Sequence, residues 1–142
     1  MLDRLPKHKY TRALEVACSQ GLLTKDLLSK KYGEVVMFDK CHIAREEADD
    51  NNIDNKNVLV EKPCSMQDYK FGPYRSYTGI YMRWCLGYLN RDEQIDFLQR
   101  AQKALANEPG RYSRTNPPPS YIFVLDNIDY DKNRKEPLKI KG

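Results

Sequence analysis

Hydrophobic residues along this chain fall into short continuous runs that alternate with segments of helical spacing. The runs lie at residues 12–17, 34–39, 57–60, 80–86 and 121–125. Residues 22–32 and 91–106 repeat apolar positions three and four apart, as amphipathic helices do, and residues 42–50 are a further candidate helix. Because the runs are continuous rather than alternating, we expect strands buried on both faces. The pattern predicts an α/β fold, a parallel sheet of about five strands flanked by helices.

This pattern occupies residues 12–128, which we expect to form one domain preceded by an N-terminal segment, residues 1–11. At 142 residues the chain is long enough for one domain with its own core. Pro109, Gly110 and a triple proline predict an extended loop over residues 107–120. Residues 129–142 form a charged tail that is too polar to add core strands.

Charge and cysteine content narrow the classes of function. Charged residues make up 31% of the chain and no apolar run approaches the roughly 20 residues that cross a bilayer, so we expect a soluble protein without a membrane span. The net charge of +4 comes from intermingled basic and acidic residues, and nucleic-acid binding is not indicated. The four cysteines form no C-x-x-C pair, so we expect reduced thiols and no metal site. In the absence of a secretory segment we expect the cytoplasm or the nucleus, and the mitochondrial interior stays open.

Residues 80–89 (IYMRWCLGYL) carry the most informative motif. They resemble the strand-four signature of the α-N-terminal protein methyltransferases, which reads roughly I-W-I-Q-W-V-I-G-H-L. Those enzymes use S-adenosylmethionine to methylate the first amino group of a protein chain. The resemblance runs from about Arg12 to Asn127. It implies a Rossmann-like fold, here without the N-terminal lid and the C-terminal hairpin that the family carries.

The resemblance also implies a set of cofactor-binding positions, several of them substituted. The family's turn reads E/D-x-G-x-G-x-G, whereas residues 15–21 read EVACSQG, with Ala17 and Ser19 in place of glycines. Each added Cβ hinders close approach to the backbone, and a left-handed backbone there adds strain of about 1 kcal/mol or more. The alternative for this turn is a plain strand–turn–helix without a ligand. The positions assigned to the cofactor are Glu15, Ala17, Gly21, Asp39, Met66, Gln67 and Arg83.

Two positions bear directly on cofactor affinity. Leu22 stands where the family's arginine pairs with the cofactor carboxylate, a contact worth about 1.5 to 3 kcal/mol, so affinity is expected to fall by about two orders of magnitude. Asp39 follows a buried strand, where the family has its ribose-binding acid. Its alternative role is to cap a helix that begins at His42. We expect S-adenosylmethionine to bind weakly or not at all.

On the substrate side, the resemblance assigns Trp84, Tyr88 and Asn127, and the last two would carry catalysis in an active enzyme. Trp84 matches an aromatic wall residue, with core packing as its alternative. Tyr88 replaces a histidine that helps to take a proton, and a phenol with an ordinary pKa near 10 is a poor base. Arg83 replaces a glutamine and would repel a cationic substrate.

These substitutions favour a methyltransferase-like protein that is catalytically degenerate and acts as a structural or binding subunit of a larger protein assembly. The alternative is an active S-adenosylmethionine-dependent protein α-N-terminal methyltransferase, and cofactor binding without turnover lies between the two. Residues 121–125 would form an apolar edge strand, because the tail is too charged to cover it. We therefore expect other protein subunits to cover that edge.

Overall fold

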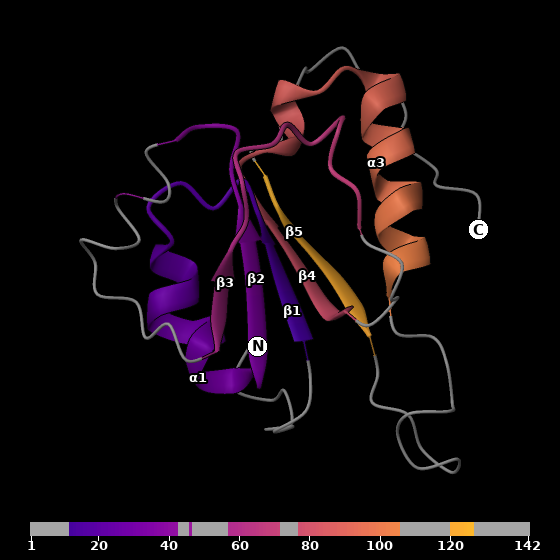
Figure 1. Ribbon diagram of the computed structural model, residues 1–142. Coiled ribbons are helices and arrows are strands. Elements are labelled where there is room, and N and C mark those ends of the chain that lie inside the picture. The colour runs from indigo at the N-terminus through magenta and orange to yellow at the C-terminus, as the bar shows by residue number, and fades with distance from the viewer. Residues whose placement is uncertain (1–11, 43–45, 47–56, 72–76, 106–119, 127–142) are drawn as a thin grey trace, which may run out of the picture.

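The computed structural model describes residues 12–42, 46, 57–71, 77–105 and 120–126. Within these ranges five strands form one parallel sheet in the order β3-β2-β1-β4-β5 (Figure 1). The predicted α/β fold is confirmed. The strands are β1 (Arg12–Val16), β2 (Glu34–Phe38), β3 (Val58–Val60), β4 (Tyr77–Arg83) and β5 (Tyr121–Leu125).

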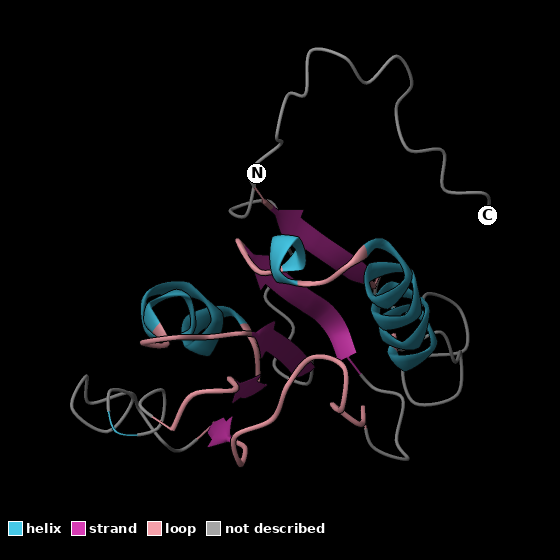
Figure 2. Cartoon of the chain, turned by 90° about the horizontal axis from the view of Figure 1, so that it is seen from above, coloured by secondary structure: helices cyan, strands magenta, loops and turns pink. Residues whose placement is uncertain are grey.

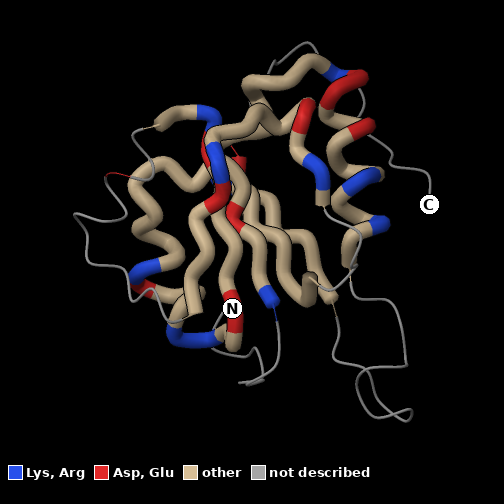
Figure 3. Tube along the Cα trace, in the orientation of Figure 1, with Lys and Arg blue, Asp and Glu red and all other residues tan. Residues whose placement is uncertain are grey.

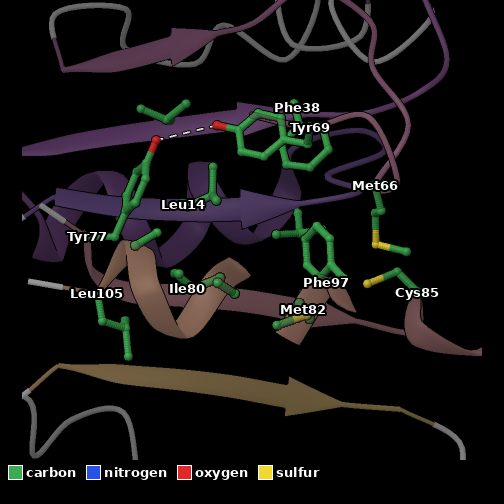
Figure 4. Close-up of a cluster of buried hydrophobic side chains, with 14 of the residues drawn as sticks. Leu14, Phe38, Met66, Tyr69, Tyr77, Ile80, Met82, Cys85, Phe97 and Leu105 are labelled. Carbon is green, nitrogen blue, oxygen red and sulfur yellow. Dashed lines mark hydrogen bonds between the residues drawn. The ribbon is translucent and has the colours of Figure 1, made fainter. Parts of the chain in front are cut away.

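Helices cover both faces of the sheet, as Figure 2 shows from above. One face packs on α3 (Arg91–Ala104), whose Phe97 and Ala101 are fully buried in a cluster with alternate residues of β1, β2 and β4 (Figure 4). The other face carries a second cluster around Leu28, which lies in a helical segment between β1 and β2. Successive residues of the central strands thus enter opposite clusters, which explains their continuous apolar runs.

The helix between β1 and β2 is less regular than the predicted helix over residues 22–32. It is widened to π-helical geometry over η2 (Thr24–Leu28) and continues as α1 (Ser29–Lys31). The helix ends at Lys31, and its C-cap Tyr32 has an extended backbone, with φ −110° and ψ 148°, so that Gly33 takes the C′ position without a positive φ. An extended Tyr32 leads directly into β2 without the glycine's special freedom.

Strand β4 lies three residues earlier than the predicted strand over residues 80–86. Tyr77, Thr78 and Gly79 belong to it. The hydrophobic pattern did not include them, because Thr78 and Gly79 interrupt the apolar run before Ile80. The strand ends at Arg83 because Trp84 adopts a left-handed backbone, with φ 54°. A 3₁₀ turn, η3 (Leu86–Tyr88), follows instead of further strand. Residues 84–88 therefore lie beyond the carboxyl end of β4 rather than within the sheet.

Helix α3 begins at a capping box, in which Asn90 and Glu93 each accept the other's backbone N–H. Its end at Ala104 and the ends of β1, β2 and β3 differ from the predicted bounds by one or two residues, and β5 agrees with its prediction.

Several predictions fall outside the described residues. They concern the N-terminal segment, the tail at 129–142, the family's lid and hairpin, and nearly all of the helix at 42–50 and of the loop at 107–120. Basic and acidic residues are intermingled over the part of the chain that is described (Figure 3). No helix within that part has the length and apolar character needed to span a membrane.

Candidate functional site

A cleft of about 770 Å³ lies at the carboxyl ends of β1, β2 and β4. In an open parallel sheet, ligands bind outside these ends, where the chain order switches direction. Here β1 leads to β2 on one side and β4 leads to β5 on the other, so the cleft lies at the switch point. Its walls are Glu15, Ala17–Gln20, Phe38–Cys41, Cys64–Gln67, Arg83–Cys85, Tyr88 and Leu89.

The turn after β1 keeps a glycine-like backbone although two of its residues are not glycine. Ala17, Ser19 and Gly21 have φ values of 51°, 49° and 68°, all in the left-handed region. The left-handed conformation of an L-residue costs about 1 to 2 kcal/mol at each position, so the strain envisaged for Ala17 and Ser19 is present. The third non-glycine residue with positive φ among those described, Trp84, lies in the cleft wall as well.

Asp39 stabilises the strained turn from the end of β2. Its carboxylate accepts the backbone N–H of Ser19 and that of Cys41, each at 2.9 Å. The backbone of Cys18 donates to Phe38, and Cys64 donates to the main-chain oxygen of Asp39. These bonds join the turn, the end of β2 and the segment after β3 into one wall.

Glu15 is a buried acid beneath the turn and is 3% exposed. Its Oε2 accepts the hydroxyl of Thr24 at 2.5 Å and the backbone N–H of Thr24 at 3.1 Å. Burial raises the pKa of Glu15 to about 7, although the Thr24 hydrogen bonds and the charge of Arg83 lower it. Through these hydrogen bonds Glu15 connects the end of β1 to the following helix. Its assignment to the cofactor did not include this structural role.

The opposite wall comes from the end of β4 and the turn that follows. The guanidinium of Arg83 lies over the Trp84 ring, with 5.2 Å between its carbon and the ring centroid. Trp84 is 56% exposed and Tyr88 is 85% exposed, so the core-packing alternative for Trp84 is wrong. The backbone N–H of Trp84 donates to Leu125 at 2.7 Å, which connects this wall to β5.

The third wall, Met66 and Gln67, is held in place by α3. Arg100 donates to the backbone oxygens of Met66, Gln67 and Tyr69 at 3.1, 3.2 and 2.7 Å. Tyr69 in turn stacks on Phe38, with ring centroids 3.8 Å apart (Figure 4). Arg100 on α3 thus positions one wall of the cleft, although Arg100 itself does not line the cleft.

The sequence model of a family described as AdoMet dependent proline di-methyltransferase matches residues 2–140. The chain belongs to this family. A curated relative, N-terminal Xaa-Pro-Lys N-methyltransferase 1 from Danio rerio, is 28% identical over 123 residues, which are 84% of this chain and 48% of the relative. The chain thus spans about half the length of that methyltransferase.

Solved structures confirm the Rossmann-like methyltransferase fold. A SAM-dependent methyltransferase from Leishmania major is 27% identical with a TM-score of 0.64, over 75% of this chain and 42% of that one. The phosphoethanolamine N-methyltransferase 1 of Haemonchus contortus, in complex with phosphoethanolamine and S-adenosylhomocysteine, has a TM-score of 0.65 at 20% identity, over 73% of this chain and 22% of that one. At this identity the second likeness concerns the fold alone.

The structure brings together most positions that sequence comparison with this methyltransferase family had singled out. In the cleft walls lie Glu15, Ala17, Asp39, Met66, Gln67, Arg83, Trp84 and Tyr88. Gly21 closes the turn by donating to Cys18 but does not line the cleft, and Leu22 does not line it either. Asn127 falls outside the described residues.

Sequence reasoning missed several parts of this site. All four cysteines line the cleft, although about twenty residues separate each from the next in the chain. They are free thiols, and burial raises the pKa of Cys18 and that of Cys85, the latter to about 11, which makes both poor nucleophiles. No group of three or more metal-ligating side chains is found among the residues the structure describes. Thr24 and Arg100 were also missed, because their hydrogen bonds to Glu15 and to the segment after β3 depend on tertiary packing.

Proposed function

We propose that this chain is a catalytically degenerate member of its methyltransferase family, which binds an S-adenosyl ligand weakly in the cleft and acts as a binding subunit of a protein assembly. The observation that carries the proposal is the left-handed backbone of Ala17 and Ser19. That backbone preserves the form of a ligand-binding turn at the switch point of the sheet. The Cβ atoms of the same two residues lower the affinity, because they stand where the ligand approaches the backbone.

The adenosine side of the cleft suits such a ligand. Asp39 has a carboxylate at the end of β2, where an acid can accept ribose hydroxyls. Met66 and Gln67 offer an apolar and an amide side chain to the adenine on the neighbouring wall. S-adenosylmethionine, when bound, would supply an activated methyl group. In our account the chain's own residues only bind and orient this ligand.

The substrate side suits methyl transfer to an amine poorly. Tyr88, in place of the family's histidine, is 85% exposed, so its hydroxyl gains little from a dry site. Arg83, half-buried in the wall, places a positive charge where an ammonium substrate would have to approach. Tyr88 is thus a poor proton acceptor, and Arg83 opposes the binding of a protein α-ammonium group.

Strand β5 supports the second half of the proposal, a partner chain. Tyr121, Val124 and Leu125 are 39%, 48% and 59% exposed on a strand that pairs only with β4 among the described residues. An apolar edge strand of this kind favours pairing with a strand from another protein. The partner we propose is therefore a protein subunit that adds a strand along β5.

An active N-terminal methyltransferase is the second candidate. It is favoured by the exposed face of Trp84 in the cleft and by Asp126, whose carboxylate accepts the N–H of Gly87 and so holds the turn that carries Tyr88. Mass spectrometry of an Xaa-Pro-Lys peptide incubated with the chain and S-adenosylmethionine separates the two candidates. We expect no methylated peptide. Methylation that is lost on Trp84→Ala, in a chain that still binds S-adenosylhomocysteine, would establish the active enzyme.

A further inference from the structure

Arg83 is a cation in the cleft wall that the rest of the described chain does not neutralise. Its guanidinium forms no ion pair and donates no hydrogen bond to another described residue. The guanidinium carbon lies 5.2 Å from the centroid of the Trp84 ring, which supports the flat group but uses none of its N–H donors. An arginine that is half-buried in a cleft, and whose donors meet no acceptor among the described residues, is a binding group for an anion.

The two acids of the cleft are already engaged elsewhere. Glu15 accepts two hydrogen bonds from Thr24, and its burial keeps it partly protonated near neutral pH. Asp39 accepts the backbone N–H groups of Ser19 and Cys41. Among the described residues, therefore, no acid forms an ion pair with Arg83.

We propose that Arg83 binds the carboxylate of the ligand's amino-acid group, the contact that Leu22 cannot make in this chain. The inference rests on the proposed function, since it names how the same cleft holds an S-adenosyl ligand. Leu22 is apolar, 39% exposed and outside the cleft walls. The carboxylate-binding cation has thus moved from the helix after β1 to the end of β4, on the other side of the cleft.

The new position has a consequence for the kind of ligand accepted. An arginine at the end of β4 favours an adenosyl ligand that carries a carboxylate. The same fixed charge disfavours an ammonium group at the neighbouring Trp84, because like charges repel. One residue would then both retain the cofactor and exclude an amine substrate.

The test compares two ligands that differ only at this end. S-adenosylhomocysteine carries the amino-acid group, whereas 5′-methylthioadenosine lacks it and serves as an internal control for the adenosine side. Affinities of the full chain are measured by ligand-observed NMR titration, which reaches millimolar dissociation constants. Arg83→Gln should weaken S-adenosylhomocysteine about 10- to 100-fold and change 5′-methylthioadenosine by less than about twofold.

Further variants sharpen the comparison. Arg83→Lys keeps the charge without the planar fork and should weaken S-adenosylhomocysteine less than Arg83→Gln does, so it also serves if the glutamine variant does not fold. Lys40→Gln tests the other cation of the wall as the carboxylate's partner, and Lys103→Gln, which changes an exposed cation of α3 outside the cleft walls, is the control that should leave both affinities unchanged. Adding Leu22→Arg to Arg83→Gln should recover part of the lost affinity.

The outcomes separate this inference from the proposed function. An equal loss for both ligands, or no loss for either, would overturn the role of Arg83 while the cleft still binds. A loss caused by Lys40→Gln alone would assign the carboxylate to Lys40 instead. If the wild-type chain binds neither ligand, the proposed function fails, and the role of Arg83 fails with it.

Discussion

The carboxylate of Asp39 accepts the backbone N–H of Ser19 at 2.9 Å, so an acid at the end of β2 holds a left-handed residue in the turn after β1. The two residues are twenty positions apart in the chain and meet only because β1 and β2 are parallel neighbours. This contact explains how a turn that has lost two glycines keeps its shape: the surrounding structure, rather than the local sequence, imposes the backbone.

Restoring glycine at both positions should therefore relieve strain. We expect the Ala17→Gly, Ser19→Gly chain to gain about 1 kcal/mol in the free energy of unfolding and to bind S-adenosylhomocysteine about tenfold more tightly. Urea denaturation and calorimetry measure the two effects. Ala13→Gly is the matched control, since Ala13 is a buried β1 residue outside the left-handed region, and this change should destabilise the chain. A less stable double variant would contradict the strain argument.

Glu15 should make stability depend on pH in a window set by its raised pKa. The unfolded chain loses this proton near the ordinary value of 4.5, whereas the folded chain keeps it to about pH 7. The folded state binds more protons between these values, so the free energy of unfolding falls as pH rises through the window and then levels off. The fall is on the order of 3 kcal/mol at most.

The Glu15→Gln variant isolates this contribution, because glutamine has no proton to lose in this range. The unfolding free energy of the wild type should fall relative to that of the variant between pH 4.5 and pH 7. Above pH 7 the difference between the two proteins should stay constant. Urea denaturation across that range provides the measurement. Parallel curves for the two proteins would show that Glu15 titrates normally.

Arg100 should be needed for the wall formed by Met66 and Gln67. A lysine cannot reach three backbone oxygens at once, so Arg100→Lys should lower the free energy of unfolding by about 1 to 3 kcal/mol. Hydrogen exchange should increase around residues 65–71 more than in β1. Arg91→Lys, at the exposed start of α3, is the control and should change neither quantity. Unchanged hydrogen exchange at residues 65–71 in the Arg100→Lys variant would contradict this role of Arg100.

The exposed edge of β5 should drive association. Without its partner, we expect the purified chain to self-associate in sedimentation experiments, and Val124→Lys should reduce this, because a charged edge residue discourages strand pairing. Ile95→Lys changes a similarly exposed aliphatic residue on α3, at 43%, and should have no such effect. A stable monomer at all concentrations would count against a partner at this edge.

Sequence patterns predicted the sheet well, because the apolar runs at β1, β2 and β5 each coincide with a strand of the parallel sheet. The expectation of burial on both faces is wrong for β5, in which no residue is buried. They misplaced β4, since its first residues include Thr78 and Gly79 and its end depends on the left-handed Trp84, which no local pattern indicates. The site was predicted in part through resemblance to the family.

Long-range contacts account for what the sequence did not predict at the site. Arg100 lies on a helix that does not line the cleft, and its three bonds to the segment after β3 depend on tertiary packing. Among the described residues, the guanidinium of Arg83 likewise has no acid partner because Glu15 and Asp39 accept hydrogen bonds from backbone and hydroxyl groups. No residue spacing in the sequence predicts either arrangement.

Calorimetric titration of the wild-type chain with S-adenosylhomocysteine decides whether the cleft is a weakened binding site. We expect a saturable heat with a dissociation constant on the order of 100 μM, because the Cβ atoms of Ala17 and Ser19 weaken binding and the rest of the cleft retains it. A dissociation constant of about 1 μM or tighter would contradict the claim that the cleft is degenerate, and no heat up to millimolar ligand would contradict the claim that it binds.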